Sequence, residues 1–168
     1  MDIGNLMTQA GLPGAVAAVA LVCLLAAAVS DIHKFEIPDE LSIAILVGAL
    51  AYGLVAPQFG WLSHLAAPLG FFAFGLLAFS RGWLGGGDVK LMTAVSAWTG
   101  LGGLLPMMVG TALAGGVLAL VLIIVRRLAA ARVTEGTHRL FRREAPLPYA
   151  VAIAAGTLWW AALAWPIR

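Results

Sequence analysis

The sequence predicts an all-α integral membrane protein with about six transmembrane helices. Hydrophobic residues make up 62% of its 168 residues and charged residues only 11%, whereas a soluble domain has about 45–50% and about 25%. The mean hydropathy is +0.98. A particle this small cannot bury so many apolar side chains in its own interior, so lipid must cover the rest. The apolar residues also fall into runs near the length that crosses a bilayer, about 20 residues.

Local signals place the beginning or end of several segments. Pro38 cannot continue a helix but suits the start of a new one, and Asp39 and Glu40 follow it in the first turn, where acids favour the helix dipole. Asp88 opens the fourth segment in the same way, and glycines at 100, 102 and 103 interrupt it. The six predicted segments are Leu12–Ser30, Asp39–Ala56, Trp61–Ser80, Asp88–Gly102, Leu104–Val125 and Leu147–Pro166.

Basic residues are concentrated after the first, third and fifth segments and at the start of the fourth. The two other connections contain no Lys or Arg. The positive-inside rule therefore places the basic connections in the cytoplasm and both termini on the extracytoplasmic side. The basic residues in question are Lys34, Arg81, Lys90, Arg126, Arg127, Arg132, Arg139, Arg142 and Arg143.

The segment 126–143 is the one long polar stretch, and two interpretations of it stay open. It is either a solvated loop that touches anionic lipid or a site that gathers a cytoplasmic substrate or partner. Cys23 is the single cysteine, so neither an intrachain disulfide nor a Cys-x-x-Cys zinc pair is possible. No metal, cofactor or nucleic-acid partner is expected.

Two aspartates are the candidates for chemistry. Asp31 follows the first apolar segment and Asp88 follows three glycines, Gly85, Gly86 and Gly87. An ionisable residue beside a membrane segment is costly and marks a functional site. The glycines permit positive φ and a close approach of another chain. Charge counting places both aspartates at the cytoplasmic interface, although they are far apart in the sequence.

These residues resemble the two signatures of the prepilin peptidases, which are Gly-x-Gly-Asp-type intramembrane aspartyl proteases. The first is Asp31 with Lys34 and Ile37-Pro38, and the second is the stretch 85–91, Gly-Gly-Gly-Asp-Val-Lys-Leu. A third element, Pro148 to Ile153, resembles part of the last span of the family. The resemblance covers most of the chain, from about Asp31 to Ile153.

The resemblance implies a bacterial inner-membrane endopeptidase that removes the leader of type IV prepilins at the cytoplasmic face. Asp31 and Asp88 would be catalytic, and the three glycines, Lys90 and Lys34 would contact substrate. Prepilins carry a short basic leader followed by an apolar helix, and pilus assembly machinery is a further possible partner. The larger members add a methyltransferase region with zinc-binding cysteines, which has no counterpart here. The chain resembles the stand-alone peptidases of tight-adherence (Flp-type) pili, with residues 1–168 as one domain.

Helix ends suggest roles for the two carboxylates. Close carboxylates do not both ionise easily, so one removes a proton from water and the other donates one. Asp88 at a helix start favours the anion and is expected to be the base, while Asp31 at a helix end is expected to be the proton donor. Lys90 would lie at the headgroups by snorkelling, tune the aspartates or meet an acidic substrate side chain.

Two other classes of function stay open. A small translocator could use the two carboxylates as a proton relay, although such relays tend to lie near the midplane. A structural subunit of a secretion complex could use the aspartates only to shape a loop.

Overall fold

The computed structural model describes residues 3–56, 59–129 and 146–164. This part of the chain forms helices and no strand, which confirms the all-α prediction. The helices are α1 (Ile3–Lys34), α2 (Asp39–Val55), α3 (Trp61–Ser80), α4 (Gly86–Ala129) and α5 (Tyr149–Ala164). Helix α1 extends beyond both predicted ends of the first segment, so Asp31 lies inside its last turn instead of following it.

Helix α4 contains two of the predicted segments, because the chain bends within it. The bend is at Gly100, whose φ of 59° and ψ of −177° lie in a region that only glycine adopts readily. Gly102 and Gly103, predicted to belong to the same interruption, are helical. The bend therefore comes earlier in the chain than the predicted end of the fourth segment.

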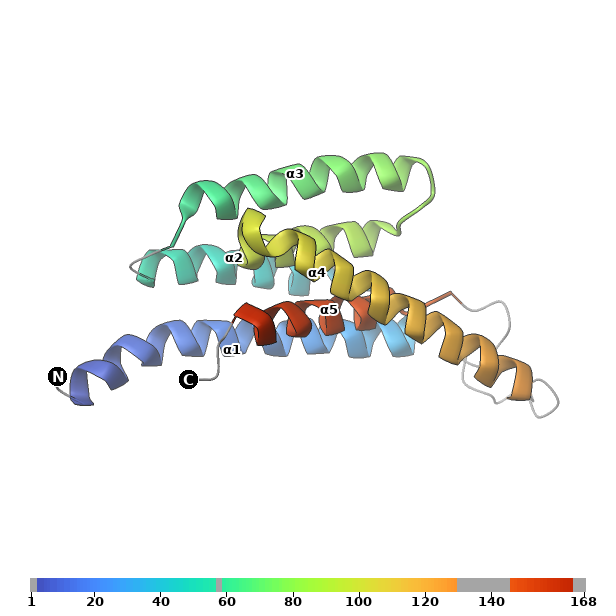
Figure 1. The fold of residues 1–168 in the computed structure, drawn as a ribbon, viewed down its shortest axis with the longest axis horizontal. Helices are drawn as coiled ribbons and strands as arrows, with labels where there is room; N and C mark the ends of the chain where they lie inside the picture. Colours follow the sequence, from blue (N-terminus) through green and yellow to red (C-terminus); the bar gives the residue numbers. More distant parts are fainter. Residues whose placement is uncertain (1–2, 57–58, 130–145, 165–168) are drawn as a thin grey trace.

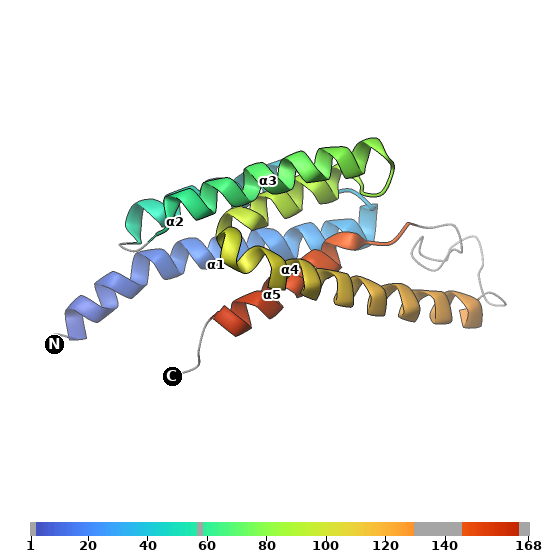
Figure 2. The same cartoon turned by 45° about the horizontal axis from the view of Figure 1, so that its top comes forward.

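The helical segments run in alternating directions. Figures 1 and 2 show this for α1, α2 and α3, and the parts of α4 before and after Gly100 also run roughly opposite ways. The beginning of α1 and the end of α5 consequently lie at one end of the bundle. The last turn of α1 and the first turns of α2, α4 and α5 lie at the other end (Figure 1).

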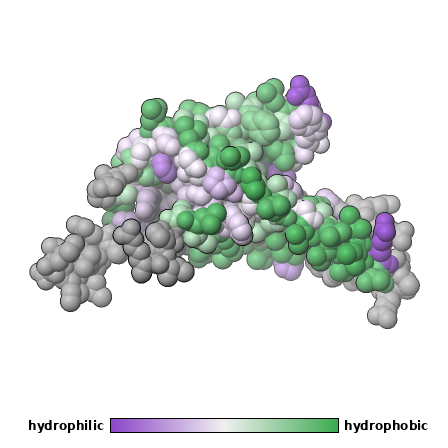
Figure 3. Space-filling view, viewed as in Figure 1, coloured by the Kyte–Doolittle hydropathy of each residue, from purple (hydrophilic) through white to green (hydrophobic). Residues whose placement is uncertain are grey.

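Three helices of the described part are long and apolar enough to cross a membrane: Gly11–Lys34, Trp61–Ser80 and Gly86–Leu128. Helix α5 is also apolar but shorter, with 16 residues. Large apolar side chains stand exposed on the outside, among them Leu54 at 79% and Leu62 at 85%. Figure 3 shows apolar side chains over most of one face, with the most hydrophilic ones at its right-hand end. A surface of this kind suits lipid better than water.

The part of α4 before Gly100 forms the centre of the bundle. Its Leu91 and Val95 are almost completely buried and pack with Ile45 of α2 and Ile153 of α5. The indole N–H of Trp98 donates to the backbone C=O of Ile45 at 2.8 Å. Helix α4 therefore passes through the centre of the bundle, and its first turn lies beside the turn between α1 and α2, where Gly87 meets Ile37.

Two buried serines, Ser42 and Ser96, differ in whether their hydroxyl is hydrogen-bonded, and alanine should therefore affect stability differently at each. Ser42 of α2 is 6% exposed, and its hydroxyl has no hydrogen-bond partner among the described residues. Ser96 of α4 is 0% exposed and its hydroxyl donates to the C=O of Thr93 at 2.7 Å. Ser42→Ala is expected to be more stable than Ser96→Ala by about 1–2 kcal/mol, because only Ser42 buries an unpaired hydroxyl. The gain in helix propensity is common to both and cancels.

Thermal unfolding of both variants and the wild type in one detergent measures this difference. A Ser42→Ala variant that is less stable than Ser96→Ala would show that the Ser42 hydroxyl has a stabilising partner.

Candidate active site

A cavity of about 630 Å³ opens where the last turn of α1 and the first turns of α2 and α4 meet. The segment before α5 closes it from the remaining side. Most of its ionisable lining residues are acids. The lining residues are Asp31, Phe35, Glu36, Ile37, Asp39, Glu40, Gly85, Gly86, Gly87, Asp88, Lys90, Pro146 and Leu147.

Asp31 is held from the far end of the chain. Its Oδ2 accepts a hydrogen bond of 2.8 Å from the backbone N–H of Ala150, in the first turn of α5. The residue is only 6% exposed. An acid at the beginning of a helix meets unpaired backbone N–H groups and the positive end of the helix dipole. Asp31 therefore caps α5 from α1.

The turn that follows Asp31 contains a strained residue. Phe35 has a φ of 56°, a conformation that glycine adopts far more readily than a bulky residue. Its N–H donates to the C=O of Asp31 at 2.9 Å, and the hydroxyl of Ser30 donates to the C=O of Glu36 at 2.9 Å. These bonds end α1 and turn the chain toward Pro38, so that Phe35 itself lines the cavity.

Asp88 lies in the first turn of α4 and faces the same cavity. The backbone N–H of Gly85 bonds to its carboxylate, and Asp31 lies close enough for the two carboxyl groups to interact electrostatically. The two aspartates thus lie together despite their separation in sequence. Asp88 lies in the first turn of α4, and Asp31, in the last turn of α1, faces the N-terminal end of α5. The ends of the helices alone therefore do not distinguish which carboxylate carries the proton.

The three glycines line the cavity and allow close contacts rather than unusual backbone angles. A Cβ at Gly85 would lie 2.8 Å from Oδ2 of Asp88, and one at Gly87 would lie 3.2 Å from Cβ of Ile37. None of the three has a positive φ; Gly82 and Gly100 do. The close approach is therefore to side chains of the same chain, which places α4 directly against the turn between α1 and α2.

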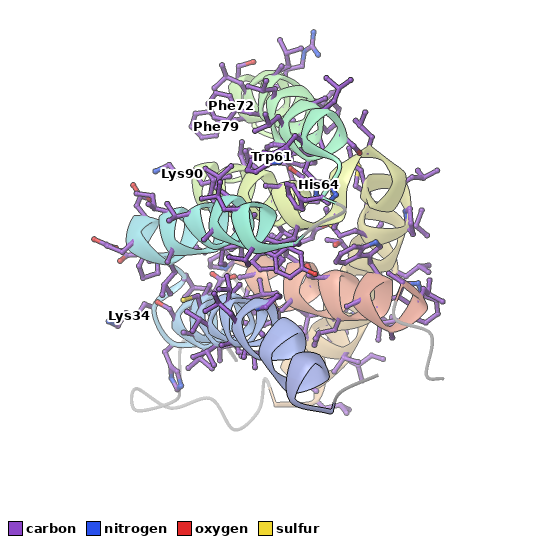
Figure 4. All side chains as sticks on the ribbon, turned by 90° about the vertical axis from the view of Figure 1, so that its left-hand side faces the viewer. Lys34, Trp61, His64, Phe72, Phe79 and Lys90 are labelled. Atoms are coloured by element: carbon purple, nitrogen blue, oxygen red, sulfur yellow. The ribbon has the colours of Figure 1, made fainter. Side chains whose placement is uncertain are left out.

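Lys90 and Lys34 occupy different positions. Lys90 lines the cavity and pairs with Asp39 of α2, its Nζ lying 2.8 Å from both carboxylate oxygens. The residue pattern does not predict this pairing, because the place of Asp39 after Pro38 indicates only a helix start. Lys34 is not part of the lining and its side chain points away from the bundle (Figure 4). The structure brings Lys90 to the candidate site and leaves Lys34 outside it.

The Lys90–Asp39 pair is expected to contribute little to stability. The two side chains are 51% and 58% exposed, and exposed ion pairs typically contribute about 0.2–1 kcal/mol. A double-mutant cycle with Lys90→Met and Asp39→Asn, followed by unfolding in detergent, should give a coupling energy in that range. A coupling above about 2 kcal/mol would mean that the pair is effectively buried when lipid surrounds the protein.

The segment before α5 is also tied to α4. Arg126 donates to the C=O of Pro146 at 3.2 Å, and Pro148 is fully buried. Tyr149 follows, with its ring against Gly115 and within reach of the charge of Asp88. The remainder of the polar stretch 126–143, from residue 130 onward, lies outside the described residues. Where the chain is described, no three His, Cys, Asp or Glu side chains are grouped so as to hold a metal ion.

The contact between Asp31 and Ala150 is a second feature that the residue pattern does not predict. An alanine carries no functional side chain, and its backbone N–H is common to nearly every residue. The Pro148-Tyr149 element at the start of the last segment predicts that a helix begins there. It does not predict which residue binds the backbone N–H groups of its first turn.

Comparisons with known proteins agree on one family. The model of the type IV leader peptidase family matches residues 18–120, a range that includes both aspartates. A prepilin leader peptidase/N-methyltransferase from Bacillus subtilis (strain 168) is 32% identical over 144 residues, which cover 84% of this chain and 53% of the relative. The chain thus spans about half the length of that relative. No solved structure matched the chain.

Proposed function

This chain belongs to the type IV leader peptidase family, and we propose that it is a membrane aspartyl endopeptidase that cleaves the leader from type IV prepilins, with Asp31 and Asp88 as the catalytic pair. One observation carries the proposal: two carboxylates from distant parts of the chain line one cavity at the end of an apolar bundle. The Flp-type prepilins are the proposed substrates, as in the stand-alone members that the sequence resembles.

The proposed reaction is hydrolysis of a peptide bond by water. The ionised carboxylate removes a proton from the water while the water oxygen bonds to the scissile carbonyl carbon. The protonated carboxylate donates a hydrogen bond, and then its proton, to the carbonyl oxygen. The C–N bond breaks as the leaving nitrogen takes the proton that the first carboxylate removed from the water. The other carboxylate takes a hydroxyl proton from the tetrahedral diol as the new carboxyl group forms, which restores one carboxylate and one carboxylic acid. No metal is needed for these steps.

We place the cavity at the cytoplasmic face of the bacterial inner membrane. The end of the bundle that bears the cavity also bears Lys34, Arg81, Lys90 and the Arg126–Arg127 pair, and basic residues favour the cytoplasmic side. The alternating directions of the segments, with the bend at Gly100, suit six crossings and extracytoplasmic termini. Helices α2 and α5 are short for a span, with 17 and 16 residues, close to the lower limit of about 17.

The lining of the cavity suits a basic leader. Four of its acids, Glu36, Asp39, Glu40 and Asp88, accompany Asp31, and Lys90 is engaged with Asp39. A cationic peptide is attracted to such a site and an acidic one is repelled. The apolar helix of the prepilin would remain in the lipid beside the bundle, and pilus assembly proteins would take the product. The proposed activity is cleavage by residues 1–168 as one membrane-embedded domain.

A cleavage assay in proteoliposomes tests this function. The protein is incubated with a synthetic prepilin segment that has a basic leader and an apolar helix, and the products are identified by mass spectrometry. Cleavage at the junction between leader and helix is the expected result. A peptide that stays intact would contradict the proposed protease function. A proton flux reported by a dye inside the vesicles would favour the translocator instead.

A further inference from the structure

The bend in α4 leaves one backbone hydrogen bond of the helix open. In an unbroken helix the N–H of Leu101 would donate to the C=O of Ala97, four residues earlier. At the bend the N–H of Leu101 instead donates to the hydroxyl of Ser63 at 2.9 Å. The C=O of Ala97 lies 2.9 Å from Nδ1 of His64, which must be the donor because a carbonyl only accepts. Two adjacent side chains of α3 thus satisfy both groups of one broken bond.

The contacts of Ser63 and His64 with Gly100 are close. A Cβ at Gly100 would lie 2.8 Å from the hydroxyl oxygen of Ser63 and 3.1 Å from Nε2 of His64. The imidazole ring lies against Phe59, with ring centroids 4.1 Å apart. Figure 4 shows His64 between α3 and the ribbon of α4. An unpaired backbone group is expensive in an apolar environment, so the two side chains favour this particular bend over other ones.

The bend at Gly100 lies between the part of α4 that carries Asp88 and the part that packs on α5, the helix that binds Asp31. Asp88 lies at the start of the part of α4 before Gly100. The part after Gly100 packs closely on α5, where Gly110 meets Gly156 and Gly115 meets Tyr149. The N–H of Ala150 at the start of α5 binds Asp31. A change of angle at Gly100 therefore moves the start of α4, with Asp88, relative to α5, whose first turn binds Asp31.

We propose that Ser63 and His64 are positioning residues for the aspartate pair, acting from the opposite end of the bundle by holding the bend at Gly100. This inference rests on the proposed function for its catalytic consequence. It requires no contact of either side chain with substrate, and neither residue lines the cavity that holds the aspartates.

Kinetics on four variants test the catalytic part. The double variant Ser63→Ala with His64→Phe is expected to lower kcat about a hundredfold, the loss associated with a misplacement of about 1 Å. KM should change less than about twofold, because the cavity lining is untouched. His64→Asn should restore most of kcat relative to His64→Phe, since its amide N–H can replace Nδ1–H. Ser80→Ala is the matched control: it removes one hydroxyl bond to a backbone C=O, at 2.8 Å, from the other end of α3.

A distance measurement tests the structural part without any activity. In a Cys23→Ala background, spin labels at exposed Leu69 on α3 and Leu120 on α4 report the angle of the bend in nanodiscs. The double variant should shift or broaden the distance distribution, and Ser80→Ala should leave it as in the wild type. An unchanged distribution, or a change in KM alone, overturns the inference. A wild-type protein that cleaves nothing rejects the proposed function, whereas the labels still decide whether the two residues hold the bend.

Discussion

Replacing Asp31 or Asp88 by asparagine is expected to lower the rate of leader cleavage by about 10³-fold, within the usual contribution of a general acid or base. Asparagine keeps the shape of the side chain but can neither take the proton of the water nor deliver one to the substrate. Both changes should have the same consequence, because the two carboxylates line one cavity and act on one another. Initial rates on the synthetic prepilin segment measure the effect.

Stability measurements separate this chemical loss from misfolding. In Asp31→Asn the amide oxygen of the new side chain can still accept the N–H of Ala150, so this variant should fold like the wild type. Asp31→Ala leaves that buried N–H unpaired and should lose about 1–3 kcal/mol of stability as well as activity. The same acid-to-amide change at Asp2, which precedes the first apolar segment, serves as a control. A wild-type rate in either Asp31→Asn or Asp88→Asn would remove the catalytic pair from the mechanism.

Gly156→Ala is expected to produce the largest loss of stability, about 3 kcal/mol or more. A Cβ at Gly156 would collide with the backbone and hydroxyl of Thr111, its distance to the Thr111 Cα being 2.7 Å. Backbone atoms cannot rotate away as a side chain can, so α4 and α5 must separate. Because α5 presents Ala150 to Asp31, cleavage should fall together with stability. Unfolding in detergent and the cleavage rate are the two measurements.

Gly116→Ala is the matched control for this change. Gly116 lies on α4, the helix against which Gly156 of α5 packs, and a Cβ there meets no atom within 4 Å. The substitution should leave stability unchanged or raise it by about 0.4–1 kcal/mol, because alanine loses less backbone entropy in a helix. If Gly156→Ala proved as stable as Gly116→Ala, the close packing of α4 on α5 would not exist in the membrane.

Local patterns were sufficient to predict the helices and the candidate aspartates. The run of apolar residues before Asp31 and the Pro38-Asp39-Glu40 start of α2 predict elements that the structure contains. Helix α1 continues past its predicted end at Ser30 to Lys34, and Phe35 follows it in the left-handed conformation that a glycine usually supplies.

Contacts between distant elements could not be predicted in the same way. Lys90 offered several possible roles, and its pairing with Asp39 depends on how closely α4 lies against α2. Lys34 is part of the motif that carries the family resemblance, yet its side chain points away from the cavity (Figure 4). Position in a motif therefore did not determine which of the two lysines faces the aspartates.

The sequence by itself determined that this is an apolar, all-helical protein with two acids at helix ends, because hydropathy and helix signals depend on neighbouring residues. Only the tertiary structure decided that the N–H of Ala150 binds Asp31 and that Ser63 and His64 complete the broken bond at Gly100. These contacts use backbone N–H and C=O groups. Every residue except proline carries both groups, so the side-chain sequence does not predict which backbone groups will form these contacts.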